Sequence, residues 1–324
     1  MSRKPSKPNF PHQQLSLFYT DIISDPNLRD DRDVMSYPFL SLQKRKRTKP
    51  IRFHDKKTGI KVEVTGNNEY GITTIFDYDF ILWLVSIINE AIADGHKVSQ
   101  NIRFHPYQFL VQAGWIQEGH KGGRGYLRLR SALRRLQSTS INTTLPSNFK
   151  EDEKTGKSDS NSEEFEKQWS WINDFHWYEN KDGKPIDQVE VELSKWLFDR
   201  IVKDRTVLSI HAGYFKLTKG LEKWLYRIAR RHCGNQDVIQ FTIQGLFRRY
   251  PTTGHFRQFK HQIKQMIEDI QRRDKLGEEP SFPEYKITWN CTDNGKEYII
   301  ITPKLGSREE RTLPRSARGL LQWD

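Results

Sequence analysis

The sequence predicts an α+β fold in which one order of elements occurs twice. Residues 126–136 carry apolar side chains at helical spacing opposite basic ones, and so does the stretch that begins at Phe256. A long helix, a short strand and a short helix are expected before each stretch, and two strands after it. This order is typical of a winged helix–turn–helix, so the chain is predicted to contain two such domains in tandem.

The first copy is predicted over residues 31–205. Residues 1–30 lack periodicity and are interpreted as a flexible N-terminal tail. Short strands are expected at residues 60–64 and 71–76, where apolar and polar residues alternate or β-branched residues gather. Asp79 is the expected N-cap of a buried helix over residues 80–93.

The remaining elements of the first copy follow from spacing and composition. Residues 101–104 are expected to be extended, and Pro106 to begin a short helix. Strands are expected at residues 138–144, and at residues 165–178 paired with residues 189–191. The charged, Ser-rich residues 146–164 predict a flexible loop, because they cannot support a core. The core face of the basic helix is given by residues at i, i+3, i+4 and i+7: Leu129, Ala132, Leu133 and Leu136.

The second copy is predicted over residues 206–304, before a basic C-terminal tail at residues 305–324. A helix over residues 218–233 ends before Gly234, and a strand at residues 238–243 and a short helix at residues 244–250 follow. Strands at residues 284–289 and 297–301 are expected to form a hairpin around Asn294-Gly295. The long amphipathic helix that precedes this hairpin is marked by apolar residues at Phe256, Phe259, Ile263, Met266, Ile267 and Ile270.

Composition narrows the class of protein. The chain has 53 Lys and Arg against 41 Asp and Glu, a net charge of +12, which favours a polyanionic partner. The longest apolar run, residues 80–88, is too short to cross a membrane, and the basic N-terminus lacks the apolar region of a secretory signal. Two cysteines exclude a disulfide scaffold and a four-Cys zinc site. We therefore expect a cytoplasmic protein without a membrane partner.

Two basic helices are the candidate DNA-binding elements. An arginine contacts phosphates or grips guanine O6 and N7 with its planar fork. The alternative is a solvated helix face, although such faces usually mix both signs of charge. The first helix and the residues just before it offer six basic residues without an acid: Lys121, Arg124, Arg128, Arg130, Arg134 and Arg135. The second offers Arg257, Lys260, His261 and Lys264, preceded by Arg248 and Arg249.

Other charged residues have two interpretations each. Arg227, Arg230 and Arg231 near a helix C-terminus suit the helix dipole as well as they suit DNA. The run at residues 44–47 is either a phosphate contact or a solvated loop. The acids Asp30, Asp31 and Asp33 alternate with Arg29 and Arg32 and are interpreted as a self-neutralised loop.

The sequence offers few signals of enzymatic activity. Residues 156–158 resemble the end of a phosphate-binding loop, but Glu151 stands where its first glycine is required. There is no His-x-His or His-Glu-x-x-His motif, and Asp77 and Asp79 are interpreted as helix-capping residues rather than metal ligands. His232 and Cys233 lack a second pair of ligands nearby. We expect a protein that is not an enzyme and that uses no cofactor or metal.

Four segments resemble the bacterial plasmid replication initiator protein A family. They are residues 33–44 (DVMSYPFLSLQK), 71–79 (GITTIFDYD), 125–143 (GYLRLRSALRRLQSTSINT) and 214–234 (YFKLTKGLEKWLYRIARRHCG). Together they cover roughly residues 30–304. The resemblance implies a protein with two winged-helix domains that binds iterons at a plasmid origin and helps open it. It also implies a homodimer in equilibrium with a monomer, and contacts with a host replication initiator and helicase.

The leading hypothesis is a non-enzymatic, sequence-specific binder of double-stranded plasmid origin DNA. A plasmid transcriptional repressor without an initiator role is the alternative, and a nicking replication enzyme is a third. The first domain is expected to supply the dimer contact, through residues 80–88 and the strand-rich residues 165–191.

Overall fold

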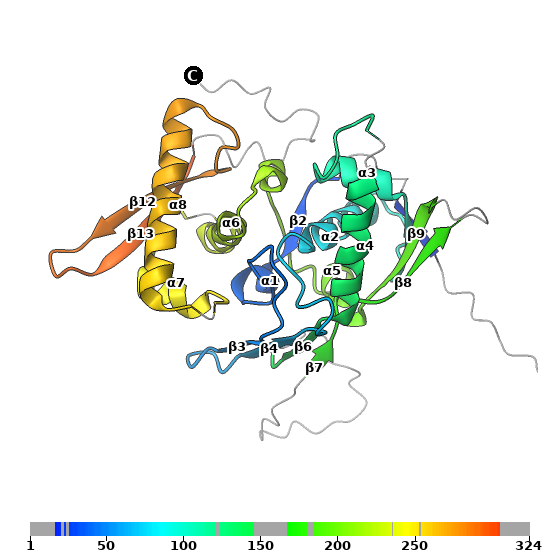
Figure 1. Cartoon of the computed structure of the whole chain (residues 1–324), viewed down its shortest axis with the longest axis horizontal. Coiled ribbons are helices and arrows are strands. Elements are labelled where there is room, and N and C mark those ends of the chain that lie inside the picture. The colour runs from blue at the N-terminus through cyan, green and yellow to red at the C-terminus, as the bar shows by residue number, and fades with distance from the viewer. Residues whose placement is uncertain are drawn as a thin grey trace, which may run out of the picture.

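The computed structural model describes residues 17–20, 23, 26–120, 123–145, 167–179, 185–234, 236–252 and 254–304 (Figure 1). The predicted loop at residues 146–164 and the predicted tail at residues 305–324 lie outside these residues. So does Lys121. None of the helices in the described part is both long and apolar enough to span a bilayer.

Helices and short strands alternate along the chain, and the predicted α+β fold is confirmed. The helices are α1 (Arg32–Ser36), α2 (Tyr78–Ala93), α3 (Pro106–Gln112), α4 (Gly123–Ser138), α5 (Lys195–Val202), the 3-10 helix η2 (Ala212–Lys216), α6 (Gly220–Cys233), α7 (Ile243–Arg249) and α8 (Phe256–Leu276). The strands are β1 (Leu17–Tyr19), β2 (Arg29–Asp31), β3 (Ile51–His54), β4 (Lys61–Thr65), β5 (Asn101–Phe104), β6 (Ser140–Thr143), β7 (Lys167–Trp169), β8 (Ile172–Glu179), β9 (Pro185–Leu193), β10 (Val207–Ser209), β11 (Ile239–Thr242), β12 (Tyr285–Cys291) and β13 (Glu297–Pro303).

The strands form four small sheets. Their orders are β1-β5-β9-β8, β3-β4-β6-β7, β2-β10 and β11-β13-β12. Only the β1–β5 pair is parallel among the named strands. The second half of the chain, residues 206–304, shows the predicted order of elements: α6, β11, α7, α8, β12, β13. The first half shows α2, β5, α3, α4, β8, β9 with β6 and β7 inserted, and these two strands join β3 and β4 in a separate sheet.

Helix α2 is the centre of the first half. Every residue from Phe80 to Ile88 is 0% exposed, because neighbouring elements cover all sides of the helix. The expectation that these residues supply a dimer contact is therefore wrong: they present no surface to a second chain. Apolar residues on every side of a helix indicate a buried helix when the run is too short for a membrane.

Three sequence-based assignments differ from the structure. Part of the predicted N-terminal tail is ordered: β1 pairs with β5, and Phe18 is only 4% exposed. Residues 71–76 form isolated bridges and a turn rather than a strand: Thr74 bridges only Ser41, and Gly71 only Asn67. The Thr73 N–H and hydroxyl donate to the Thr139 hydroxyl. Residues 165–178 do not form one strand, since β7 and β8 belong to different sheets.

Candidate nucleic-acid interface

Helix α4 is amphipathic in the structure as in the sequence. Its four predicted core residues, Leu129, Ala132, Leu133 and Leu136, are all 0% exposed. Its first turn approaches the preceding loop closely, because a Cβ atom on Gly125 would lie 2.5 Å from the Ile116 Cγ2 atom. This close contact and the apolar face together fix the basic face outward.

The arginines of α4 have different surroundings. Arg124 is exposed and forms no ion pair within the described residues. The Arg128 guanidinium lies 3.5 Å from the centroid of the Trp115 ring, and burial lowers the pKa of Arg128. Arg134 is exposed, 5.6 Å from the Tyr70 ring centroid, and Arg130 is half-buried. The outward face of α4 is therefore basic, and Arg124 is its least constrained cation.

Arg135 is engaged by a partner within the fold. Its Nε and Nη2 atoms donate to the two carboxylate oxygens of Asp77 at 2.7 Å each, and these hydrogen bonds raise the pKa of Arg135. Asp77 is 3% exposed and also accepts hydrogen bonds from Thr74. Arg135 thus joins α4 to the start of α2 instead of projecting freely with the other arginines. The sequence did not distinguish it, because the distance to Asp77 along the chain is long.

Asp77 and Asp79 do not cap a helix with their side chains. Helix α2 begins at Tyr78, and the Asp77 side chain makes no capping hydrogen bond. Asp79 instead accepts a hydrogen bond of 2.7 Å from the buried Lys223 Nζ atom. Burial raises the pKa of Asp79 and lowers that of Lys223. Among the residues that the structure describes, no group of three His, Cys, Asp or Glu side chains is placed to hold a metal ion.

Two of the three acids predicted to form a self-neutralised loop are instead buried in ion pairs, whereas Asp33 is half-buried, 4.0 Å from Arg32, and also pairs with Arg200. Asp30 and Asp31 are both 0% exposed. The Nε atom of Arg227 lies 2.6 Å from Asp30, and that of Arg200 lies 2.8 Å from Asp31. Arg230 is also buried and donates to the Ser209 carbonyl at 2.6 Å. Arg227 and Arg230 are therefore used inside the fold rather than presented to DNA, and Arg230 lies in the last turn of α6, where a cation also suits the helix dipole.

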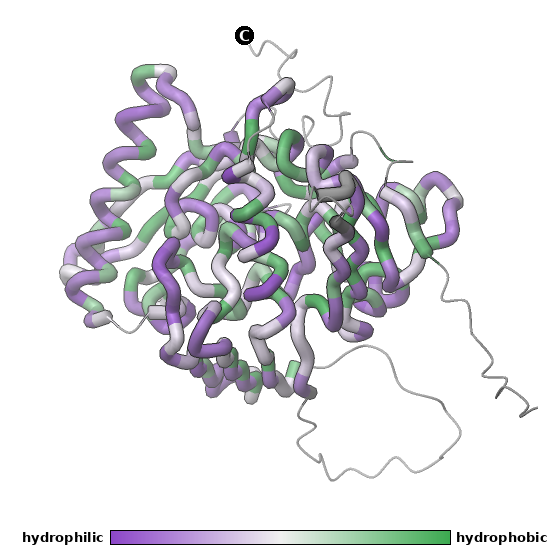
Figure 2. The backbone as a smooth tube through the Cα atoms, turned by 45° about the vertical axis from the view of Figure 1, so that its right-hand side comes forward, coloured by the Kyte–Doolittle hydropathy of each residue, from purple (hydrophilic) through white to green (hydrophobic). Residues whose placement is uncertain are grey.

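Helix α8 presents the second basic face. Phe259, Ile263, Met266, Ile267 and Ile270 are 0–5% exposed and face the core. In Figure 2, the long helix at the left, α8, alternates between hydrophilic and hydrophobic residues along its length. Arg257, His261 and Lys264 are exposed. Lys260 is half-buried in an ion pair with Glu297 of β13, which anchors the helix to the β12–β13 hairpin.

The two predicted arginines of α7 lie at its C-terminal end. Arg248 is exposed, and Arg249 is half-buried. Arg249 donates to the Ser36 carbonyl at 3.3 Å and lies 3.7 Å from Asp55. Figure 1 shows α8 and α4 on opposite sides of α6, so the two basic helices belong to different parts of one molecule. The structure thus offers two separate basic faces, each on a helix whose opposite side is firmly packed.

Comparison with known proteins agrees with the earlier resemblance. Residues 29–287 match the family model described as replication initiator protein A. A protein of Wigglesworthia glossinidia brevipalpis, described as "Putative replication protein", is 30% identical over 277 residues, which are 84% of this chain and 89% of that protein.

Two solved structures share the fold. A crystal structure of domains 2 and 3 of RctB covers 82% of this chain and 94% of its own, with a TM-score of 0.55. A second structure, of the RctB domains 2–3, covers 86% of this chain and 99% of its own, with a TM-score of 0.53. Both are 12% identical in sequence, so the likeness concerns the fold. Because the family model spans most of its length, the chain belongs to the replication initiator protein A family.

Proposed function

We propose that this chain is a non-enzymatic initiator that binds double-stranded plasmid origin DNA sequence-specifically and helps open the origin. One observation carries the proposal: α4 and α8 each bury an apolar face and expose a basic one. Residues 123–138 contain no acid, and in α8 the first acid is Glu268. Family membership supports a role in starting replication.

We further infer that each half is a winged helix. Helices α3 and α4 pack together in the first half, and α7 and α8 do so in the second. In each half an antiparallel hairpin follows, β8–β9 or β12–β13. In this motif the second helix of the pair enters the major groove and its N-terminal residues contact base edges. Arg124 and Arg257 are the exposed arginines nearest those N-termini.

Opening of the origin follows if binding energy is used to deform DNA. Bending or untwisting a duplex costs a few kcal/mol and depends on the sequence being deformed. Two reading helices on one molecule hold two points of the duplex at a fixed separation. The same proposal includes an equilibrium between monomer and homodimer and contacts with a host initiator and helicase. These parts come from the family resemblance.

The test of this function begins with sites selected by the purified chain from random duplexes. Affinity is then measured on a selected and a scrambled duplex at several salt concentrations. We expect the selected duplex to bind on the order of a thousandfold more tightly, a ratio typical of specific binding. Equal affinity for both duplexes contradicts specific recognition.

The initiator role is tested by deleting the gene from its replicon. We expect replication to stop, whereas a repressor without an initiator role leaves replication intact. Incubation of supercoiled origin DNA with the chain and a divalent metal addresses the nicking alternative. We expect the supercoiled form to persist, and nicked circles contradict the proposal.

A further inference from the structure

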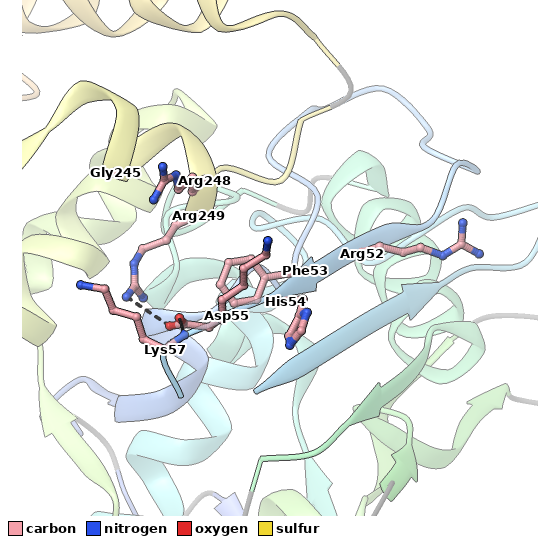
Figure 3. Close-up of a pocket in the computed structure, with 9 residues that line it drawn as sticks. Arg52, Phe53, His54, Asp55, Lys57, Gly245, Arg248 and Arg249 are labelled. Carbon is pink, nitrogen blue, oxygen red and sulfur yellow. Dashed lines mark hydrogen bonds and ion pairs between the residues drawn. The ribbon is translucent and has the colours of Figure 1, made fainter. Parts of the chain in front are cut away.

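A basic cleft lies where the turn between β3 and β4 meets α7 (Figure 3). Its volume is about 620 Å³. Figure 3 shows Arg248 and Arg249 approaching from α7 on one side, with Asp55 and Lys57 at the end of β3 on the other. The cleft is therefore built from segments that lie about 190 residues apart in the sequence.

Cations outnumber acids in the lining of this cleft. Its charged residues are Arg52, Asp55, Lys56, Lys57, Arg248 and Arg249. Arg52 is paired with Glu63 at 2.6 Å, and Arg249 lies 3.7 Å from Asp55. Within the described residues, the side chains of Lys56, Lys57 and Arg248 have no ion-pair partner. Three unpaired cations that converge from two segments repel one another, and an anion between them relieves that repulsion.

The two walls of the cleft are fixed in place. The turn after β3 is closed by a hydrogen bond of 2.8 Å from the Gly59 N–H to the Asp55 carbonyl, and Gly59 has a positive φ of 73°. The Lys57 N–H donates to the Asp55 carboxylate at 3.0 Å. On the other wall, the Thr242 hydroxyl accepts from the Gly245 N–H at 3.0 Å and caps α7. A ligand would therefore meet a preformed site and would order little of the chain on binding.

The position of the cleft indicates which anion it holds. Residues 250–255 alone separate α7 from the start of α8. In a helix–turn–helix the first helix crosses the DNA backbone beside the groove that the second helix reads. A duplex on α8 therefore runs past the C-terminal end of α7, where Arg248 and the β3–β4 turn lie together.

We propose that this cleft holds a phosphate group of the DNA backbone beside the groove read by α8, with Lys56 and Lys57 supplied by the first half of the chain. The proposal rests on the proposed function. It adds that the first half of the chain helps the second half to contact the DNA backbone. Binding by α8 thereby becomes dependent on the position of the β3–β4 turn. The contact carries no sequence information, because a phosphate is the same at every base pair.

The first test is the salt dependence of binding by the double variant Lys56→Ala/Lys57→Ala. Both lysines are exposed, so the variant is expected to fold as the wild type does. The logarithm of the association constant falls linearly as the logarithm of the salt concentration rises. Each lost phosphate contact makes this decline shallower by about 0.9 and weakens binding roughly eightfold at 0.1 M salt. We expect the loss on selected and scrambled duplexes alike. The control is Lys97→Ala, an exposed lysine after α2 that lines neither the cleft nor a reading helix, and its slope should match the wild type.

The second test locates the contact on the DNA. Duplexes carrying one neutral methylphosphonate linkage at a time are bound by the wild type and by the double variant. We expect the wild type to lose affinity at one or two linkages beside the α8 groove, and the double variant to be insensitive there. The charge-retaining variant Lys56→Arg/Lys57→Arg should regain the sensitivity.

The outcomes separate this proposal from the proposed function. A wild type that binds the selected duplex specifically, with a double variant of identical salt slope and methylphosphonate profile, overturns the cleft proposal alone. A loss confined to the selected duplex also overturns it, because that result indicates a base contact. A wild type that does not bind DNA overturns both.

Discussion

Arg124, Arg128 and Arg135 show how far a sequence pattern determines the role of single residues. All three lie on one predicted basic face, yet Arg124 is exposed, Arg128 stacks on Trp115 and Arg135 is bound by Asp77. Helical periodicity separates core-facing from outward-facing positions, because it depends only on neighbouring residues. Whether an outward cation finds a partner depends on elements distant in sequence, and the pattern does not contain that information.

Leu127 is the most exposed large apolar side chain of the described part, at 67%. It lies between Arg124 and Arg128 on the outward side of α4. If α4 enters a major groove, Leu127 meets base edges, and the apolar group offered there is the thymine methyl. We expect replacement of one thymine by deoxyuridine to weaken wild-type binding, and Leu127→Ala to remove that sensitivity. The control is Leu276→Ala, exposed near the end of α8. An equal deoxyuridine penalty in wild type and Leu127→Ala contradicts the prediction.

His232 makes the stability of the second half dependent on pH. Burial, followed by the nearby charges of Arg231 and Arg249, lowers the pKa of His232 from 6.5 to about 4. The folded state therefore favours the neutral ring, and the unfolded chain takes up the proton first as pH falls. The free energy of unfolding should drop between pH 6.5 and pH 4, by at most about 3 kcal/mol.

The variant His232→Phe tests this pH dependence. The imidazole Nε2 atom is buried without a hydrogen-bond partner among the described residues, and the ring packs edge-on against Phe241 at 5.3 Å. Phenylalanine therefore fits the site without a titrating group. Urea denaturation at several pH values should show a shallower decline for the variant. The same decline in both proteins shows that His232 is not its cause.

At the scale of elements, long periodic segments could be predicted, and several of the shortest strands could not. Helices α2, α3, α4, α6, α7 and α8 all occur where the sequence predicts a helix. Strands β1, β2 and β10 have three residues each, too few to show a period. β2 in particular is defined by its distant partner β10 and by the buried pairs of Asp30 and Asp31, and all three of its residues are charged.

The Arg135–Asp77 pair should hold α4 against α2. Removing one partner of a buried ion pair leaves an uncompensated charge and costs about 3 kcal/mol or more. We expect Arg135→Ala to lower the free energy of unfolding by roughly this amount in urea denaturation. Arg135→Lys should fall between it and the wild type, because lysine keeps the charge but loses the two-pronged contact. The exposed Arg124→Ala is the matched control, expected within about 0.5 kcal/mol of wild type. A comparable small change for Arg135→Ala would show that the pair is dispensable.

At the scale of the whole molecule, the two halves share buried polar contacts. The ion pairs Arg227–Asp30 and Lys223–Asp79 join α6 to the first half, and β2 pairs with β10 across the predicted boundary at residue 205. The sequence predicts two domains because the same order of helices and strands occurs twice along the chain. It does not show these contacts, because each partner resembles an ordinary surface charge when taken alone.

These contacts predict that the halves lose stability together. Asp30→Ala leaves Arg227 buried and unpaired, which should cost about 3–5 kcal/mol. Amide hydrogen exchange should then accelerate in both α2 and α8, although the substitution lies in β2. The exposed Asp293→Ala in the β12–β13 turn is the control. Faster exchange confined to one half would show that the halves are energetically separate.

Under the proposed function, we expect α4 and α8 to read two successive major grooves of one duplex. The measurement is a scan of single base-pair substitutions across a selected site, bound by wild type, Arg124→Ala and Arg257→Ala. We expect each variant to lose about 1–3 kcal/mol on the original site and to become insensitive to substitution at its own block of positions. The two blocks should lie about 10 base pairs apart, one turn of the duplex. If both variants become insensitive at the same positions, or if both keep the wild-type response to every substitution, α4 and α8 do not read separate grooves.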